Sequence, residues 1–330
     1  MAEIVAAADA GRWEAVAGDR MLDPHCLREF AIAQAGEGTT PVLVRAAGKG
    51  WSVLEVLEIT EVGGGHRTAR APLYGGPWLK IATDDADMAR RARREIDAAL
   101  RDLSVISEVT VHSPWLPEPD LVRQAWQGQA TRSVCLASLS HPDQAWAALP
   151  PGRRTEIRHA CREGIARWRC FDEEQAVHFA AVYRSAMDRL RASQRWRLDR
   201  PYFEKLSREA GRFVHLAAIE LPTGGAAALF LHNGRRAAYL FAARWGQAGG
   251  AAAAALWTGI VELGRMGIEE MLLGGGTTDT VDDSLLRFKS AFADRRIPLL
   301  VSARVFDREA HSWAAAMGRA RPLPAFALDA

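Results

Sequence analysis

The sequence predicts an α/β protein made of two similar domains, each a mixed, mostly antiparallel sheet flanked by helices. The chain has 330 residues, a length typical of two domains or one large one. The order of elements expected in its first half recurs in its second half: helices, three strands, a helix and a further strand. Strands joined by short turns pair antiparallel, whereas a strand that follows a helix rejoins the sheet in parallel. Both halves therefore predict the same mixed sheet.

The first half supplies the first sheet. Turn signals at Gly48-Lys49-Gly50 and Gly75-Gly76-Pro77 separate its apolar runs. We expect, in chain order, helices at 3–17 and 24–35, strands at 41–46, 52–59 and 70–74, a helix at 84–103, and strands at 104–111 and 131–139. The pattern changes at Leu149-Pro150-Pro151-Gly152. This change places a first domain at 1–148 and a second domain at 149–310.

The second half repeats the order with an extra helix at its start. We expect, in chain order, helices at 153–166, 173–192 and 201–210, strands at 213–221, 226–233 and 236–243, a helix at 249–265, a strand at 268–273, a helix after Asp283, a strand at 297–306 and a helix near 311–317. The helical stripe at 173–192 and the Asn233-Gly234 turn are the clearest of these signals.

Composition argues against several classes of protein. A net charge of +2 gives no global basic field, so DNA binding is not expected and any RNA would have to meet a local patch. The four cysteines form no CxxC pair and have no His at a metal-ligand spacing, so neither a disulfide framework nor a metal site is expected. There is no signal peptide pattern and no apolar run near the ~20 residues that span a bilayer. We expect a cytoplasmic protein without membrane insertion.

The stretch 268–292 carries the strongest functional signal. An apolar strand runs into Gly274, Gly275 and Gly276, and a polar loop then leads to a helix that Asp283 is suited to cap. This arrangement brings backbone N–H groups and a helix N-terminus to the end of a strand, where charged ligands bind readily. The glycines either contact a ligand or simply form a tight strand exit.

Lys289 is the residue of most interest in this helix. It is one of four lysines in a chain whose other basic residues are arginines, and it lies on the flank of the apolar stripe. A lysine on a half-buried face suggests that a compact ammonium is needed there. The alternative is a snorkelling side chain whose stem covers apolar surface.

Four segments resemble the Fem-type transferases, which are tandem relatives of the GNAT N-acetyltransferase fold and attach amino acids from aminoacyl-tRNA to an amine. The segment LGGG at 273–276 with DSLLRFKSAF at 283–292 is similar to the family's most specific signature. APLYGGP at 71–77 is similar to a loop of the family, and RRTEIRHA at 153–160 resembles its basic helix, although His159 stands where the family usually has Lys. Met187 with Tyr202-Phe203 is a weaker match.

The resemblance implies a tandem GNAT fold and an enzyme that forms an amide bond. It implies that residues 311–330 return to complete the first domain, that Lys289 is catalytic, and that Tyr74, Gly75 and Gly76 bind substrate together with Gly274, Gly275 and Gly276. The donor would be aminoacyl-tRNA, with no further cofactor, and the acceptor a small amine such as a cell-wall precursor or a natural-product amine. Asp283 could accept a proton from the incoming ammonium or could only cap the helix.

The helix expected at 153–166 is a candidate contact for the acceptor end of the tRNA. Arg154, Arg158 and Arg162 share one face at four-residue spacing, which suits a phosphate-rich partner. The alternative is a solvated face paired with Glu156 and Glu163.

The alternative function is acyl transfer from coenzyme A. Ordinary GNAT enzymes cradle the pyrophosphate with a glycine-rich turn at a helix start, and Gln247, Gly250 and Ala252 fit that spacing at the start of the expected helix at 249–265. These enzymes also often use a Tyr on the following helix, where this chain has Phe288 and Phe292. We therefore expect aminoacyl-tRNA as the donor, with acetyl-coenzyme A as the alternative.

Overall fold

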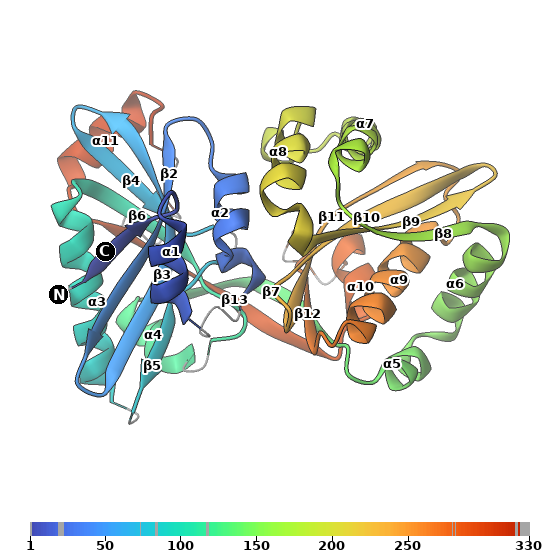
Figure 1. The fold of residues 1–330 in the computed structure, drawn as a ribbon, viewed down its shortest axis with the longest axis horizontal. Helices are drawn as coiled ribbons and strands as arrows, with labels where there is room; N and C mark the ends of the chain where they lie inside the picture. The colour runs from blue at the N-terminus through green and yellow to red at the C-terminus, as the bar shows by residue number, and fades with distance from the viewer. Residues whose placement is uncertain are drawn as a thin grey trace. The chain divides into compact units, whose positions relative to one another are not determined.

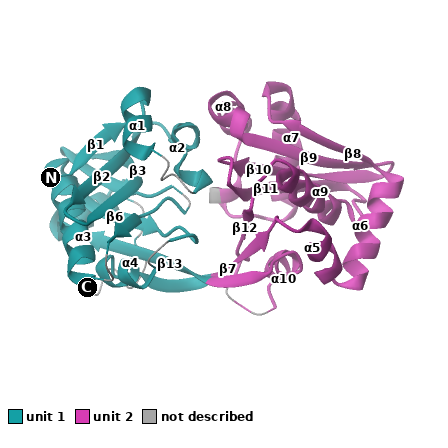
Figure 2. Ribbon diagram, turned by 60° about the horizontal axis from the view of Figure 1, so that its bottom comes forward, with its two compact units in different colours: residues 1–132, 298–330 teal, residues 133–297 magenta. Residues whose placement is uncertain are grey.

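A computed structural model describes residues 2–18, 23–72, 74–82, 85–116, 119–278, 280, 282–320 and 323, without the side chain of residue 195. The chain forms two compact units, shown in different colours in Figure 2. Unit 1 contains residues 1–132 and 298–330, and unit 2 contains residues 133–297.

Unit 1 is a mixed sheet with helices on both faces (Figure 1). Its elements are β1 (Glu3–Ala6), α1 (Ala10–Ala17), the 3₁₀ helix η2 (Pro24–Cys26), α2 (Arg28–Gln34), β2 (Thr39–Gly48), β3 (Trp51–Gly63), β4 (His66–Arg70), β5 (Trp78–Ile81), α3 (Ala86–Asp102), β6 (Val105–Val111), α4 (Pro119–Ala125) and α11 (Arg308–Ala316). The order in the sheet is β1-β2-β3-β4-β6-β13, where β13 is Arg295–Val305 and β5 pairs with β3. Only β4 and β6 are parallel among these pairs with a described register.

The core of unit 1 follows the alternation of its strands. Val42 and Val44 of β2 and Val53 of β3 pack with Ile96 and Leu100 of α3. On β6, by contrast, Ile106 belongs to a separate cluster with residues of α11. Neighbouring strand residues point to opposite faces, so α3 and α11 cover different sides of the sheet.

Unit 2 repeats this plan. Its elements are β7 (Gln129–Ser138), α5 (Pro142–Ala148), α6 (Pro151–Glu163), β8 (Ile165–Cys170), α7 (Glu173–Arg189), η3 (Gln194–Trp196), α8 (Arg200–Ala210), η4 (Gly211–Phe213), β9 (Val214–Leu221), β10 (Gly224–His232), β11 (Arg236–Gly246), α9 (Ala251–Arg265), β12 (Glu270–Gly274) and α10 (Ser284–Ser290). The order in the sheet is β7-β12-β11-β10-β9-β8, with β11 and β12 parallel.

Different helices cover the two faces of the unit 2 sheet, as Figure 1 shows. Tyr183 of α7 and Phe203 of α8 pack edge-on against Phe241 of β11 on one face. On the other face, the ring of Phe230 on β10 packs against Gly259 of α9. A Cβ at position 259 would stand 2.2 Å from a carbon of that ring, so glycine is needed there. The helix α9 therefore lies close to the middle of the sheet.

Two strands contribute residues to both units. β7 passes from unit 1 to unit 2 at residues 132/133, and β13 returns at 297/298. The sequence pattern had placed the change at 148/149, between α5 and α6. That proline-rich stretch ends the short helix α5 inside unit 2, and the hydrogen bond from Asp294 N to Leu136 O already belongs to that unit.

The predicted fold class is confirmed, and most predicted elements are present. Residues 3–6, expected as helix, form the edge strand β1 paired with β2. The expected helix at 153–166 ends at Glu163, and the edge strand β8 pairs with β9. The helices α4 and α5 were not predicted. Edge strands and seven-residue helices gain their stability from neighbours far along the chain, so their local patterns are weak.

Candidate active site

The triple glycine lies where β12 leaves the sheet of unit 2. Gly274 has a φ of +79°, in the left-handed region that glycine adopts without steric cost. The pairing of β12 with β7 shifts register between Leu272 and Gly274, which lies opposite Cys135. Gly275 and Gly276 then carry the chain away from the strand toward α10.

Asp283 both caps α10 and closes the loop. Its Oδ1 accepts a hydrogen bond from the backbone N–H of Leu286 at 2.7 Å. Its Oδ2 accepts from the backbone N–H groups of Thr277 and Thr278, both at 2.9 Å, and from the hydroxyls of both threonines. A Cβ at Gly276 would stand 2.5 Å from Oδ1. Glycine at 276 therefore leaves room for the carboxylate that orders the loop.

These hydrogen bonds also lower the pKa of Asp283. Burial by itself raises the pKa of this carboxyl, but the donors on Thr277, Leu286 and Thr278 outweigh it and hold the pKa well below its usual range. A carboxylate with so low a pKa binds a proton weakly. The structure therefore shows the capping role that the sequence allowed, and its geometry gives no support to proton transfer by Asp283.

Lys289 projects from α10 toward the same loop. Its side chain is only 9% exposed, and Nζ donates a hydrogen bond to the carbonyl oxygen of Gly275 at 2.9 Å. Nζ also lies 5.7 Å from the centre of the Tyr239 ring on β11. A snorkelling lysine would carry its ammonium out to water, whereas this ammonium is held at the strand exit.

Tyr239 is a neighbour of Lys289 that the sequence did not reveal. It lies on β11, separated from Lys289 by α9 and β12, and its ring also packs on Phe230. Burial raises the pKa of its hydroxyl well above the ordinary value. No local pattern could have found it, because only the parallel pairing of β11 with β12 brings it to the strand exit.

The site therefore combines a fixed cation with little access to water. In such surroundings an ammonium interacts with a developing negative charge more strongly than it would in bulk water. Of the predicted residues, the structure brings together Lys289, Gly275, Gly276 and Asp283. Lys289 and Asp283 act on the same loop from one helix.

The start of α9 is packed against α6. A Cβ at Gly250 would stand 2.5 Å from the backbone oxygen of Glu156. Ala251, in the first turn of α9, is fully buried, whereas Gln247 is exposed. The glycine in the predicted coenzyme A pattern of Gln247, Gly250 and Ala252 is thus accounted for by close helix packing.

The arginines of α6 lie beside α5. Arg154 donates a hydrogen bond to the carbonyl oxygen of Ala147 at 2.9 Å, and the guanidinium of Arg158 lies 5.2 Å over the ring of Trp146. Arg158 and Arg162 are exposed, and Arg154 is half-buried. The three arginines follow one side of the helix, as their four-residue spacing predicts.

Two arginines of the same helix pair with acids. Arg162 forms an ion pair with Glu163 at 2.9 Å, and Arg153 forms one with Glu156. Arg153 also lies over Phe288 of α10, 5.2 Å from the ring centre. One residue of the predicted basic face, Arg162, is therefore paired with an acid, whereas Arg153, outside that face, contacts the helix that carries Lys289.

Tyr74, Gly75 and Gly76 lie in unit 1, between β4 and β5. Tyr74 has a φ of +63°, and its ring lies 5.1 Å from that of the buried His25. The N–H of Gly75 closes a turn onto the carbonyl oxygen of Pro72 at 2.8 Å. A Cβ at Gly76 would meet Glu55 at 3.4 Å. The loop thus packs on the side-chain stem of the buried Glu55.

Glu55 belongs to a buried charge cluster. Burial, and then the neighbouring Glu108, raise its pKa to about 8, although Arg93 acts in the opposite direction. Arg93 also pairs with Asp97 and Glu108. This cluster supports β3 and β6 beneath the Gly76 loop.

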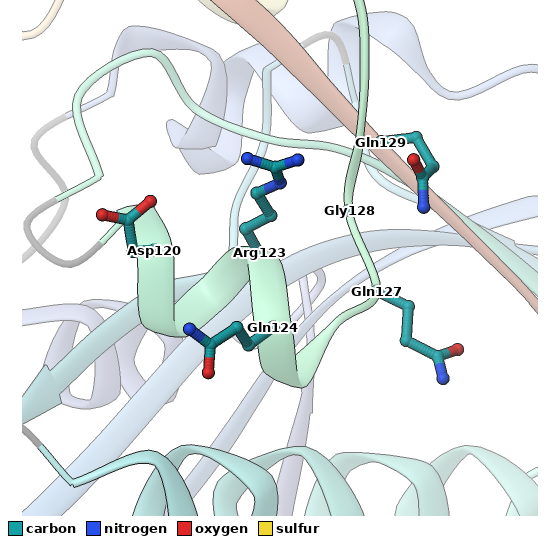
Figure 3. Close-up of a pocket in the computed structure, with 6 residues that line it drawn as sticks. All are labelled: Asp120, Arg123, Gln124, Gln127, Gly128 and Gln129. Carbon is teal, nitrogen blue, oxygen red and sulfur yellow. The ribbon is translucent and has the colours of Figure 1, made fainter.

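One cavity lies in unit 1, beside α4. It has a volume of about 470 Å³ and is lined by Asp120, Arg123, Gln124, Gln127, Gly128 and Gln129. Figure 3 shows that these polar side chains do not converge on one point. We assign no role to it.

The structure also bears on metals and membranes. Within the described part of the chain, no group of three or more His, Cys, Asp or Glu side chains is placed to hold a metal ion. Among the described residues, no helix has both the length and the apolar character needed to cross a bilayer.

Similar folds occur among solved structures. FemX is 11% identical, with 95% of this chain and 99% of FemX covered and a TM-score of 0.70. A C-terminal domain assigned to a lysylphosphatidylglycerol synthetase from Agrobacterium fabrum is 12% identical, with 95% of each chain covered and a TM-score of 0.56. L-PGS from Bacillus licheniformis is 10% identical, with 95% and 98% covered and a TM-score of 0.56.

These similarities confirm the predicted Fem-like tandem GNAT fold. At sequence identities this low, the similarity shows a shared fold and nothing about activity. The sequence matches no protein-family profile and no curated protein.

Proposed function

We propose that this protein is an N-acyltransferase that forms an amide bond by moving an aminoacyl group from aminoacyl-tRNA to an amine. The observation that carries this proposal is the position of Lys289. Lys289 is nearly buried, and its ammonium is held on the Gly275 carbonyl at the end of β12. A cation fixed in a nearly dry site is what stabilisation of an oxyanion requires.

In this reaction the unprotonated amine attacks the ester carbonyl of the donor. A C–N bond forms, negative charge develops on the carbonyl oxygen, and the C–O bond to the ribose then breaks. Lys289 stabilises the oxyanion, and its ammonium can also offset charge near the ribose oxygen as that group leaves. The amine loses one proton and the ribose oxygen gains one, so the exchange is balanced.

Asp283 has a positioning role in this proposal. Its carboxylate fixes Thr277 and Thr278 and starts α10, and so sets the direction from which Lys289 reaches the loop. Because its acceptor atoms are already engaged by these donors, the amine proton leaves through another group or through water. Tyr74, Gly75 and Gly76 are proposed to bind substrate within unit 1.

The contact between α6 and α9 favours aminoacyl-tRNA over coenzyme A. The backbone of Glu156 lies where a Cβ at Gly250 would stand, so this glycine is explained by helix packing and is no independent sign of a pyrophosphate site. The exposed Arg158 offers charge to a phosphate backbone instead. The name of one similar structure, a lysylphosphatidylglycerol synthetase, also points to an aminoacyl group.

Parallel titrations test this choice of donor. Purified protein is titrated with a mixture of charged tRNAs and, separately, with acetyl-coenzyme A, each at two salt concentrations. We expect binding of tRNA that weakens at the higher salt concentration, because phosphate contacts release counterions. Binding of acetyl-coenzyme A without binding of tRNA would overturn the proposed donor and would support the acyl-coenzyme A alternative.

A further inference from the structure

A second cavity, in unit 2, lies between α5 and α9, apart from the Lys289 loop. Its volume is about 470 Å³, within the range of small-ligand pockets. Trp146 of α5 and Trp257 of α9 line it, together with Asp143 and Arg265. Aromatic, acidic and basic side chains thus meet in one hollow of the surface.

The two tryptophans form an aromatic platform that is open to the surface. Their ring centres lie 5.0 Å apart at an interplanar angle of 52°, and both side chains are half-buried. Their inner edges pack on the core of unit 2. Half-buried aromatic rings beside a cavity are suited to stacking on a flat, unpaired nucleobase.

The charges around the pocket favour the base of a nucleotide over its phosphate as the group that binds there. Asp143 is exposed at the pocket, and a carboxylate repels phosphate but accepts hydrogen bonds from the amino group of a base. The basic groups lie next to it: Arg158 stacks on Trp146, and Arg154 donates to Ala147. Within the described residues, neither arginine forms an ion pair with an Asp or Glu. A base in the pocket would therefore have its phosphates near Arg154 and Arg158.

The helix α6 joins this pocket to the Lys289 loop within one unit. At its start, Arg153 lies over Phe288, which precedes Lys289. At its middle, Arg158 lies over Trp146. Arg153 and Arg158 are separated by about 7.5 Å of rise along the axis of α6.

We infer that the pocket of Trp146 and Trp257 binds an unpaired base near the single-stranded 3′ end of the donor RNA. This inference rests on the proposed function, since it assumes that the donor is a tRNA. The terminal nucleotide lies at Lys289, and a base upstream of it stacks on the two tryptophans.

Two synthetic RNA hairpins of acceptor-stem length test the inference. One carries a four-nucleotide single-stranded 3′ overhang, and the other is blunt. Binding of both is measured for the wild type and for Trp257→Leu, which removes the aromatic ring but keeps bulk, and Trp257→Phe, which keeps an aromatic ring. Trp313→Leu, at an exposed tryptophan of unit 1, is the matched control. Thermal unfolding of each variant confirms that it folds.

We expect the wild type to bind the overhang hairpin about tenfold more tightly than the blunt one, as one stacked base predicts. Trp257→Leu should abolish this difference, and Trp257→Phe and Trp313→Leu should retain it. Quenching of tryptophan fluorescence by the overhang should be lost with Trp257→Leu.

Other outcomes separate this inference from the proposed function. If the wild type binds both hairpins equally, or if Trp257→Leu keeps the difference, the inference is wrong and a tRNA donor still stands. If the wild type binds neither hairpin and no charged tRNA, the inference and the proposed donor are both wrong.

Discussion

The carboxylate of Asp283 lies against the α-carbon of Gly276, so that a Cβ there would stand 2.5 Å from Oδ1. One strand exit and one helix start thus depend on each other. Lys289 donates a hydrogen bond to the carbonyl oxygen of Gly275, the residue before Gly276. This packing therefore also sets the position of the ammonium.

Gly276→Ala tests that dependence. The added methyl group must displace Asp283 or the loop, so we expect a loss of about 1–3 kcal/mol in the free energy of unfolding, as for other overpacked sites. Activity should fall as well, because Lys289 would lose its fixed partner. Denaturant unfolding measures the first effect. Gly152→Ala, where a Cβ meets no atom within 4 Å, serves as the control for stability.

Asp283→Asn changes the charge of the cap while keeping its shape. The amide oxygen can still accept one set of hydrogen bonds, but the NH₂ group faces further donors. We expect a loss of about 1–3 kcal/mol in the free energy of unfolding, measured in denaturant. If Asp283 instead served mainly as a proton acceptor, Asp283→Asn would leave stability intact and abolish turnover.

Lys289→Met removes the charge while keeping much of the stem. We expect kcat to fall by roughly 10²–10³, the effect of losing one oxyanion-stabilising group, while the KM for the donor changes little. Lys289→Arg should be impaired too, because a nearly buried position suits a compact ammonium better than a planar guanidinium. Wild-type turnover by both variants, with normal folding, would remove Lys289 from the mechanism.

His215 and His232 predict an acid-sensitive step in the stability of unit 2. Both are buried, and their rings lie 5.1 Å apart. Burial, followed by the effect of His215, lowers the pKa of His232 to about 4, and burial lowers the pKa of His215. The unfolded chain therefore binds more protons than the folded chain below about pH 6.5. Stability is retained above this pH and is lost as the pH falls toward 4.

His232→Leu removes one of these titrating groups. We expect the decline in the free energy of unfolding between pH 6.5 and 4 to become shallower, by on the order of 1–3 kcal/mol. Denaturant unfolding at several pH values measures this slope. His141→Leu, at an exposed histidine of the same unit, should leave the slope as in the wild type.

The sequence was most informative where a local pattern carries the structure. Three glycines followed by a capping Asp predicted the exit from β12 and the start of α10, because both depend on neighbouring residues. The strand β8 was not predicted, because the helix expected at 153–166 covers its first residues, Ile165 and Ala166. It is a strand because β9 pairs with it, with Trp168 opposite Ala217.

The site also depends on contacts that no window of sequence contains. In the sequence, Gly250 matched a phosphate-binding pattern. The structure gives a different reason for this glycine, which is the close packing of α6 on α9. Trp146 and Trp257 come from helices separated by most of unit 2. Such pairs follow from tertiary packing, which binary patterns specify only in outline.

The most direct test follows the aminoacyl group itself. Wild type and Lys289→Met are incubated with tRNA charged with labelled amino acids and a mixture of small amines, and alkali-stable label is measured; labelled acetyl-coenzyme A is tested in parallel. We expect the wild type to convert the labile ester of the tRNA into a stable amide, at least a hundredfold faster than Lys289→Met. Transfer from acetyl-coenzyme A alone, or equal transfer by both proteins, would contradict it.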